Sequence, residues 1–198
     1  MDLKKQKDNF KNHVAKFTDY GNIKILDFVN LNSSHYRIRF LFEEDYCKLH
    51  ISGDLGELIA TNYSNMTYEK FSGFVNDIGY FEGKIDCHSR KIYLYNEEDA
   101  KEDIKDIIEE YALLDVILED DEFIWKSDEE KLEEFYNDVL EDFSQENGIG
   151  SKGYDALSKY IDDVWEFARD IGKRETGILD LYMLAFKMTK EQIDNGGA

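Results

Sequence analysis

Apolar residues follow two different patterns along the chain. In the N-terminal half, short runs of β-branched and aromatic residues alternate with polar ones, as at Ile38, Phe40 and Phe42. Clusters of turn-forming residues separate these runs, which is typical of an antiparallel sheet with one buried face. The predicted strands are residues 23–29, 36–42, 45–51, 55–61 and 90–96.

Two helices are predicted beside these strands. Residues 3–17 carry apolar side chains at helical spacing, among them Phe10 and Phe17. Thr67 has the side chain of an N-cap residue and precedes a short apolar stretch at 71–78. We therefore expect an N-terminal helix over 3–17 and a second, short helix that Thr67 caps.

From residue 96 onward the apolar period becomes helical. One apolar stripe runs through residues 104–118 and another through 132–143. A glycine-containing loop at 147–153 follows, and two further helices are predicted over 154–171 and 177–193. Most of the C-terminal half is thus expected to be helical.

The order of strands first and helices afterwards indicates the α+β class. Residues 1–95 are expected to form the N-terminal helix and a small antiparallel sheet, and residues 96–198 a helical region with an acidic outer face. The pattern leaves open whether the two regions form one compact domain. Ser127, followed three residues later by Glu130, predicts a capping box at the start of one helix.

The charge of the chain is large and unevenly distributed. Its 198 residues include 44 acidic and 24 basic ones, which gives a net charge of −20. Residues 1–95 have a net charge of zero, residues 96–146 of −18 and residues 147–198 of −2. This distribution excludes a protein that grips nucleic acid through a basic face, so no direct binding to duplex DNA is expected.

The remaining composition indicates a cytoplasmic protein. No apolar run approaches the roughly twenty residues that span a bilayer, and none follows the N-terminus as in a secretory signal. Cys47 and Cys87 fit free thiols in a reducing compartment. Proline is absent where about ten would be expected, which together with abundant Asn, Ile, Lys and Tyr suggests a low-GC bacterial genome or its phage.

The acidic segment departs from the usual rules of helix stability. Carboxylates crowd the predicted helix C-termini at 119–122 and 138–142, where they oppose the helix macrodipole. Most i,i+4 neighbours carry the same charge, as Glu98 and Glu102 do, and each such pair costs about 0.2–0.5 kcal/mol. Acidic residues that destabilise their own helices without a compensating local interaction indicate a surface with a function.

We therefore expect the acidic helices to bind a basic surface built for phosphates, with aromatic residues as anchors. Duplex DNA presents about one charge per 1.7 Å of its axis, and a dense carboxylate surface offers an Arg/Lys groove a substitute. The alternative is an acidic face that only keeps a phage accessory protein soluble. The candidate partner-binding residues are Glu98, Asp99, Glu102, Asp103, Asp106, Glu110, Glu119, Asp120, Asp121, Glu122, Phe123, Trp125, Glu130, Glu134, Tyr136 and Asp138.

An enzymatic alternative rests on a short match to a metal-dependent nuclease site. Glu82-Gly83-Lys84 has the E-x-K spacing of such sites, and either Asp54 or Asp77 offers a second carboxylate for Mg²⁺. The alternative is thus a metal-dependent nuclease or another nucleic-acid-modifying enzyme, with the candidate catalytic set Asp54, Glu82, Lys84 and His88. This alternative predicts an activity that EDTA abolishes.

Zinc binding is not favoured, although two cysteines lie close to histidines. Cys47 and His50 are three residues apart on a predicted strand and therefore point to opposite faces. Cys87 and His88 are adjacent and cannot readily converge on one ion. The sequence leaves open whether Cys87 and His88 have a chemical role or belong to a surface turn. No cofactor and no bound metal are expected.

Four stretches together resemble a group of small acidic proteins encoded in prophages of low-GC Gram-positive bacteria. They are YGNIKILDF (20–28), YRIRFLFEEDYCKLHISGDLGELIATNY (36–63), KIDCHSRKIY (84–93) and TGILDLYMLAFKM (176–188). The resemblance implies an inhibitor of host defence such as an anti-CRISPR protein, which binds a Cas9-type effector and covers its nucleic-acid-binding surface. It assigns no catalytic residue.

Overall fold

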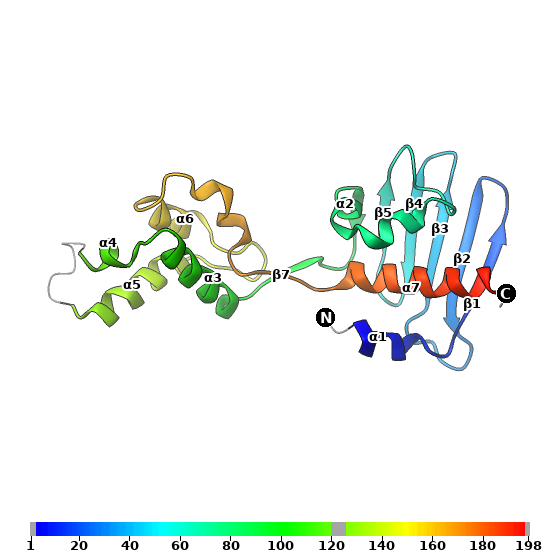
Figure 1. The fold of residues 1–198 in the computed structure, drawn as a ribbon, viewed down its shortest axis with the longest axis horizontal. Helices are drawn as coiled ribbons and strands as arrows, with labels where there is room; N and C mark the ends of the chain where they lie inside the picture. Colours follow the sequence, from blue (N-terminus) through cyan, green and yellow to red (C-terminus); the bar gives the residue numbers. More distant parts are fainter. Residues whose placement is uncertain (1–2, 120–125, 197–198) are drawn as a thin grey trace. The chain divides into compact units, whose positions relative to one another are not determined.

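The structure, a computed structural model, describes residues 3–119 and 126–196. The chain folds into two units that we name by their main features. The sheet unit comprises Met1–Ile92 and Gly177–Ala198, and the acidic unit comprises Tyr93–Thr176. Strands and helices are segregated as expected for the α+β class, which is confirmed (Figure 1).

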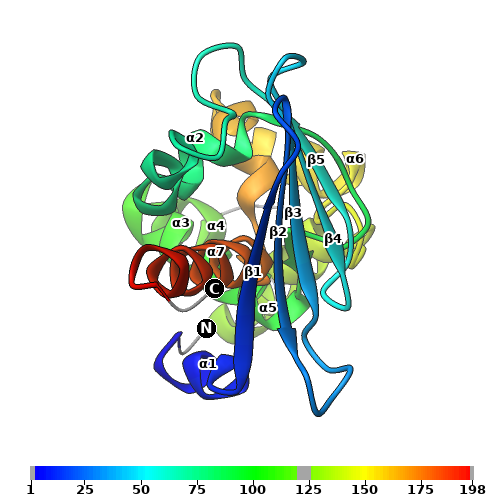
Figure 2. The ribbon, with the colours of Figure 1, turned by 90° about the vertical axis from the view of Figure 1, so that its right-hand side faces the viewer.

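The sheet unit is a six-stranded antiparallel meander in the order β1-β2-β3-β4-β5-β6. Its helices lie on one face of the sheet, as the edge-on view in Figure 2 shows. Its elements are α1 (Leu3–Phe10), β1 (His13–Asp19), β2 (Ile23–Asn30), β3 (Ile38–Glu43), β4 (Lys48–Gly53), β5 (Leu58–Thr61), η1 (Phe71–Asn76), α2 (Ile78–Glu82), β6 (Ile85–His88) and α7 (Ile178–Asp194).

The C-terminal helix α7 covers the buried face of this sheet. The ring of Phe186 contacts those of Phe40 at 5.5 Å and Phe71 at 4.8 Å, measured between centroids. The Tyr182 hydroxyl donates a hydrogen bond to the Leu55 carbonyl at 3.0 Å, and burial raises the pKa of Tyr182 to about 12. The last helix therefore belongs with the N-terminal sheet, whereas the sequence pattern had grouped it with the region 96–198.

The prediction of one helix over residues 3–17 was wrong beyond Phe10. The chain turns there and continues as β1, which pairs along its whole length with β2. His13 and Ala15 face the core while Val14 is exposed, and this alternation with a period of two fits a strand. Gln192 of α7 fixes the strand further, because its side-chain amide accepts from Ala15 N–H and donates to the His13 carbonyl, both at 2.9 Å.

Two other local expectations for the sheet unit differ from the structure. The Thr67 side chain does not cap the helical stretch η1, whose N-cap is Lys70 with no side-chain hydrogen bond. Instead, the Thr67 carbonyl accepts backbone bonds from Lys70 and Phe71. Strand β6 was not predicted, because its short, largely exposed sequence lacks a hydrophobic alternation.

The acidic unit consists of helices and one two-stranded ribbon, in which β7 pairs antiparallel with β8. The predicted helix through the stripe at 104–118 was wrong beyond Glu110, because α3 ends there and a separate helix, α4, begins at Leu114, with Ala112 between them at a φ of 52°. Helix α5 forms as the sequence predicts, and the Ser127–Glu130 capping box at its start is confirmed. The elements are β7 (Tyr93–Tyr95), α3 (Glu97–Glu110), α4 (Leu114–Leu118), α5 (Asp128–Leu140), α6 (Ser151–Ser158), η3 (Val164–Glu166), η4 (Ala168–Asp170) and β8 (Lys173–Glu175).

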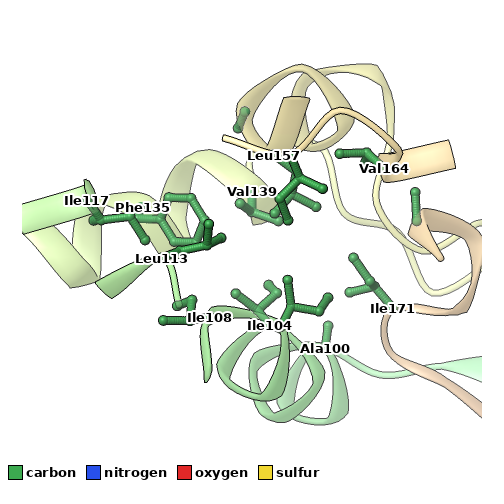
Figure 3. Packing of buried hydrophobic residues seen from close by; sticks show 14 residues of the cluster. Ala100, Ile104, Ile108, Leu113, Ile117, Phe135, Val139, Leu157, Val164 and Ile171 are labelled. Atoms are coloured by element: carbon green, nitrogen blue, oxygen red, sulfur yellow. The ribbon is translucent and has the colours of Figure 1, made fainter. Parts of the chain in front are cut away.

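The acidic unit has a hydrophobic core of its own. Ile104 of α3, Val139 of α5 and Leu157 of α6 are fully buried and point toward one another (Figure 3). The predicted helix over 154–171 was wrong beyond Ser158, because 3₁₀ turns follow. The segment still places Ile161, Val164, Ala168 and Ile171 in the same core, although Trp165 is exposed.

No helix in the described parts of the chain is both long enough and apolar enough to cross a membrane.

His13 is a buried histidine without a full set of partners. It is 4% exposed and contacts the rings of Phe10 and Phe28, at centroid distances of 5.2 and 5.0 Å. Its Nε2 lies 3.2 Å from the Tyr36 carbonyl oxygen, while its buried Nδ1 has no hydrogen-bond partner among the described residues. Burial lowers the pKa of His13, so the folded sheet unit favours the neutral imidazole.

We expect the free energy of unfolding to fall as the pH decreases through about 6.5, the ordinary pKa of histidine, because the unfolded state then binds a proton that the fold resists. A His13→Gln variant should lose part of this dependence. Urea unfolding followed by circular dichroism at about pH 7.5 and about pH 5.5 measures it. An identical decrease in both proteins would contradict the assignment to His13.

Candidate functional site

Nearly all the excess charge of the chain belongs to the acidic unit. Residues 93–176 include 28 acidic and 9 basic ones, a net charge of −19, whereas the sheet unit has 16 acidic and 15 basic residues, a net charge of −1. The segment 96–146, chosen from sequence alone, contains most of this charge. The fold therefore confines the charge to one unit with its own core.

Some of these acidic residues form ion pairs and hydrogen bonds inside the acidic unit. Arg174 of β8 forms a bidentate pair with Asp103 of α3, with N···O distances of 2.7 and 2.9 Å. Asp103 also accepts the Gly172 N–H at 2.7 Å, and Asp99 lies 3.4 Å from the same guanidinium. The hydrogen bond to Asp103 raises the pKa of Arg174. Asp99 and Asp103, both candidate partner-binding residues, thus tie β8 to α3, while Glu102 approaches Arg174 only to 4.0 Å.

Asp142 has a structural role that the sequence pattern did not reveal. Its carboxylate accepts backbone N–H groups of Lys152 at 2.9 Å, Gly150 at 3.0 Å and Gly153 at 3.2 Å. These bonds, that from Lys152 foremost, lower the pKa of Asp142. An acid that appeared to oppose the macrodipole of α5 therefore satisfies donors at the start of α6, and the expected absence of a local gain was wrong here.

Two more candidates at α5 have partners within the unit. Glu134 forms an ion pair with Lys126, and Glu130 completes the capping box with Ser127. Tyr136, expected as an aromatic anchor, is half-buried against the core, and this burial raises its pKa. Its side chain therefore contributes to packing as well as to the surface.

The remaining candidates on the described helices form an exposed surplus of carboxylates. They are exposed and make no ion pair with any described residue. This set consists of Glu98, Asp106 and Glu110 on α3, Glu119 after α4, and Asp138 on α5. Other acidic residues outside the candidate set share these properties, among them Glu109, Asp115, Glu129 and Glu133. Asp120, Asp121, Glu122, Phe123 and Trp125 lie outside the described residues.

Three residues of the alternative catalytic set have partners outside that set. Asp54 is bound by Arg37, with an N···O distance of 3.2 Å, and this hydrogen bond lowers the pKa of Asp54. The Lys84 ammonium lies over the Tyr80 ring, 4.4 Å from its centroid. Glu82 ends α2, and His88 ends β6 with its Nδ1 2.6 Å from the Arg90 carbonyl oxygen.

No metal centre is assembled from the described residues. Within residues 3–119 and 126–196, no three or more His, Cys, Asp or Glu side chains converge to hold an ion. Cys47 lies in the turn before β4 with its Sγ 3.6 Å from the Tyr63 carbonyl oxygen, and His50 faces Glu43 at 3.3 Å. Cys87 is exposed on β6.

Comparison with known proteins assigns the chain to no family: no family model matches it, and no curated protein or solved structure is significantly similar to it.

The two kinds of acid should respond oppositely to mutation. Asp142→Ala removes three accepted hydrogen bonds and should lower the free energy of unfolding of the acidic unit by about 1–3 kcal/mol. Asp138→Ala removes an exposed charge near the C-terminus of α5 and should leave stability unchanged or raise it by up to about 0.5 kcal/mol. Urea unfolding monitored by tryptophan fluorescence reports on this unit, since Trp125 and Trp165 both belong to it. Equal effects would contradict the distinction.

Proposed function

We propose that the acidic unit binds the Lys/Arg surface with which a nucleic-acid-handling bacterial protein holds its nucleic acid, and thereby blocks that surface. The observation that carries this proposal is the net charge of −19 on one unit, much of it on exposed carboxylates that the fold itself does not use. In this role the protein is an inhibitor rather than an enzyme.

The arrangement of these carboxylates suits a surface built for phosphates. Glu98, Glu102, Asp106 and Glu110 follow one another at i,i+4 spacing, which corresponds to about 6 Å of helix rise per step. Asp138 adds a charge from α5, which contacts α3. Such rows attract a basic groove over a distance of about one Debye length and make association fast and dependent on salt.

Repulsion between the acidic residues of these rows destabilises α3, and the proposed binding to a basic partner explains why the acids are present. Each i,i+4 acidic pair destabilises α3 by about 0.2–0.5 kcal/mol, and no described basic residue pairs with Glu98, Asp106 or Glu110. A basic partner would relieve this repulsion on binding. A face that served solubility alone would not need the acids at interacting positions on the same helix.

The resemblance to prophage proteins supports a specific partner, a Cas9-type ribonucleoprotein. Such effectors read the PAM and hold the heteroduplex with arginine and lysine side chains. In our proposal the protein is encoded by a phage, acts in the cytoplasm of the infected host and occupies this channel in place of DNA. The alternative, a non-catalytic accessory protein with a solubilising face, predicts no partner whose binding weakens with salt.

The test compares two sets of four charge-neutralising substitutions. Glu98→Gln, Asp106→Asn, Glu110→Gln and Asp138→Asn together should weaken binding to a Cas9-type ribonucleoprotein about tenfold or more at about 0.1 M salt. The control Asp155→Asn, Asp162→Asn, Glu166→Gln and Glu175→Gln changes the net charge equally at exposed positions elsewhere in the acidic unit. It should keep the affinity within about threefold.

Biolayer interferometry with immobilised ribonucleoprotein measures both affinities, and circular dichroism verifies that both variants fold. Equal weakening by the two sets would show that total charge acts rather than the proposed surface. No binding by the natural protein would favour the accessory alternative.

A further inference from the structure

An apolar groove opens between α3, α4 and α5 of the acidic unit. It consists of two adjoining hollows of about 560 and about 620 Å³ that share Lys105, Leu132 and Tyr136 in their walls. Ile108 and Leu114 extend the apolar lining toward α4. The groove thus lies within one unit and is built from three helices of the described chain.

The groove leaves apolar side chains accessible that a stable core would cover. Leu114, the first residue of α4, is 46% exposed although it faces the hollow. Leu132 and Tyr136 pack against the core with one side and line the groove with the other. A contiguous apolar lining of this kind on a highly charged unit is typical of an interaction site.

The charge around the groove restricts what can occupy it. Glu109 and Asp115 border one hollow and Glu129 and Glu133 the other, and all four are exposed without an ion pair to a described residue. The basic side chains at the groove are Lys105, which lines both hollows, and Lys101, which lines the second hollow and forms an ion pair with Glu97 at 3.1 Å. An apolar floor inside an acidic rim is complementary to an apolar strip flanked by lysine or arginine.

We propose that this groove binds a basic amphipathic helix of the partner protein, with its apolar side chains on Leu114, Leu132 and Tyr136 and its Lys/Arg residues against the rim. Helix-in-groove recognition uses apolar residues at i, i+3, i+4 and i+7, and the apolar side chains of the first hollow together with the shared Leu132 and Tyr136 offer a surface for such a strip. The second hollow adds charged and polar residues beside it. This inference rests on the proposed function and deepens it, because it specifies a protein element of the partner that charge alone would not select.

Two substitutions on α4 distinguish binding in the groove from general attraction between charges. Leu114→Lys and Val116→Lys each place one positive charge on the same five-residue helix, at positions that are 46% and 54% exposed. Of the two, only Leu114 lines the groove. The probe is a fluorescein-labelled amphipathic helical peptide of leucine and lysine, and the control is a scrambled peptide of the same composition.

We expect the amphipathic peptide to bind the natural protein and Leu114→Lys to weaken this binding about tenfold or more, in fluorescence anisotropy. Val116→Lys should change it less than about threefold, and the scrambled peptide should bind markedly more weakly. Equal affinity for both peptides, or equal effects of the two substitutions, would overturn the proposal and leave only attraction between charges.

Hydrogen–deuterium exchange of the natural protein gives a second test that does not depend on how well a variant folds. Peptide binding should protect α3, α4 and α5, and protection confined to other elements would overturn the proposal. A natural protein that is dimeric in sedimentation velocity and becomes monomeric with Leu114→Lys would identify a second copy as the occupant and would also overturn it.

The two proposals fail in different ways. If the peptide does not bind the groove, the four substitutions at Glu98, Asp106, Glu110 and Asp138 should still weaken binding to the ribonucleoprotein. Conversely, peptide binding that depends on Leu114 together with no ribonucleoprotein binding would keep the groove and exclude the proposed partner.

Discussion

The return of α7 to the N-terminal sheet is the constraint on which the rest of the fold depends. Phe186 packs against Phe40 and Phe71, so the end of the chain completes the core that its beginning starts. The acidic unit is therefore an insertion between β6 and α7, entered through β7 and left through β8. The Arg174–Asp103 pair fastens β8 to α3 inside this insertion. An insertion with its own hydrophobic core can accumulate charge without placing it in the sheet unit.

This separation explains how a chain with a net charge of −20 keeps a nearly neutral sheet unit. Acids in the insertion fall into two groups with different physical consequences. Asp103 and Asp142 accept several hydrogen bonds each and stabilise the fold, whereas Glu98, Asp106 and Glu110 are exposed and repel one another. A stability argument accounts for the first group alone. Our proposal therefore assigns binding to the second group. The apolar groove on the same unit adds apolar contacts to the proposed binding surface.

Periodicity was sufficient to predict the α+β class, helix α5 and the Ser127–Glu130 capping box, because local chemistry determines these features. It did not reveal the break between α3 and α4 within the stripe at 104–118. It failed at β1, where helical spacing and strand alternation both fit the sequence and pairing with β2 decided between them. It also failed to place α7, since an amphipathic helix does not specify which core it covers. Asp142 and Arg174 act across 8 to 71 positions of sequence, and their partners could not be read from spacing. The same holds for the groove, whose lining residues come from three helices.

The most direct test of the proposed inhibition measures the affinity of a Cas9-type ribonucleoprotein for labelled target DNA with and without this protein. Measurements at about 0.1 M and about 0.5 M salt separate screened from unscreened interactions. Our account predicts that the protein competes with DNA at the lower salt concentration and loses most of this effect at the higher one. DNA binding that the protein leaves unchanged at both salt concentrations would contradict the account.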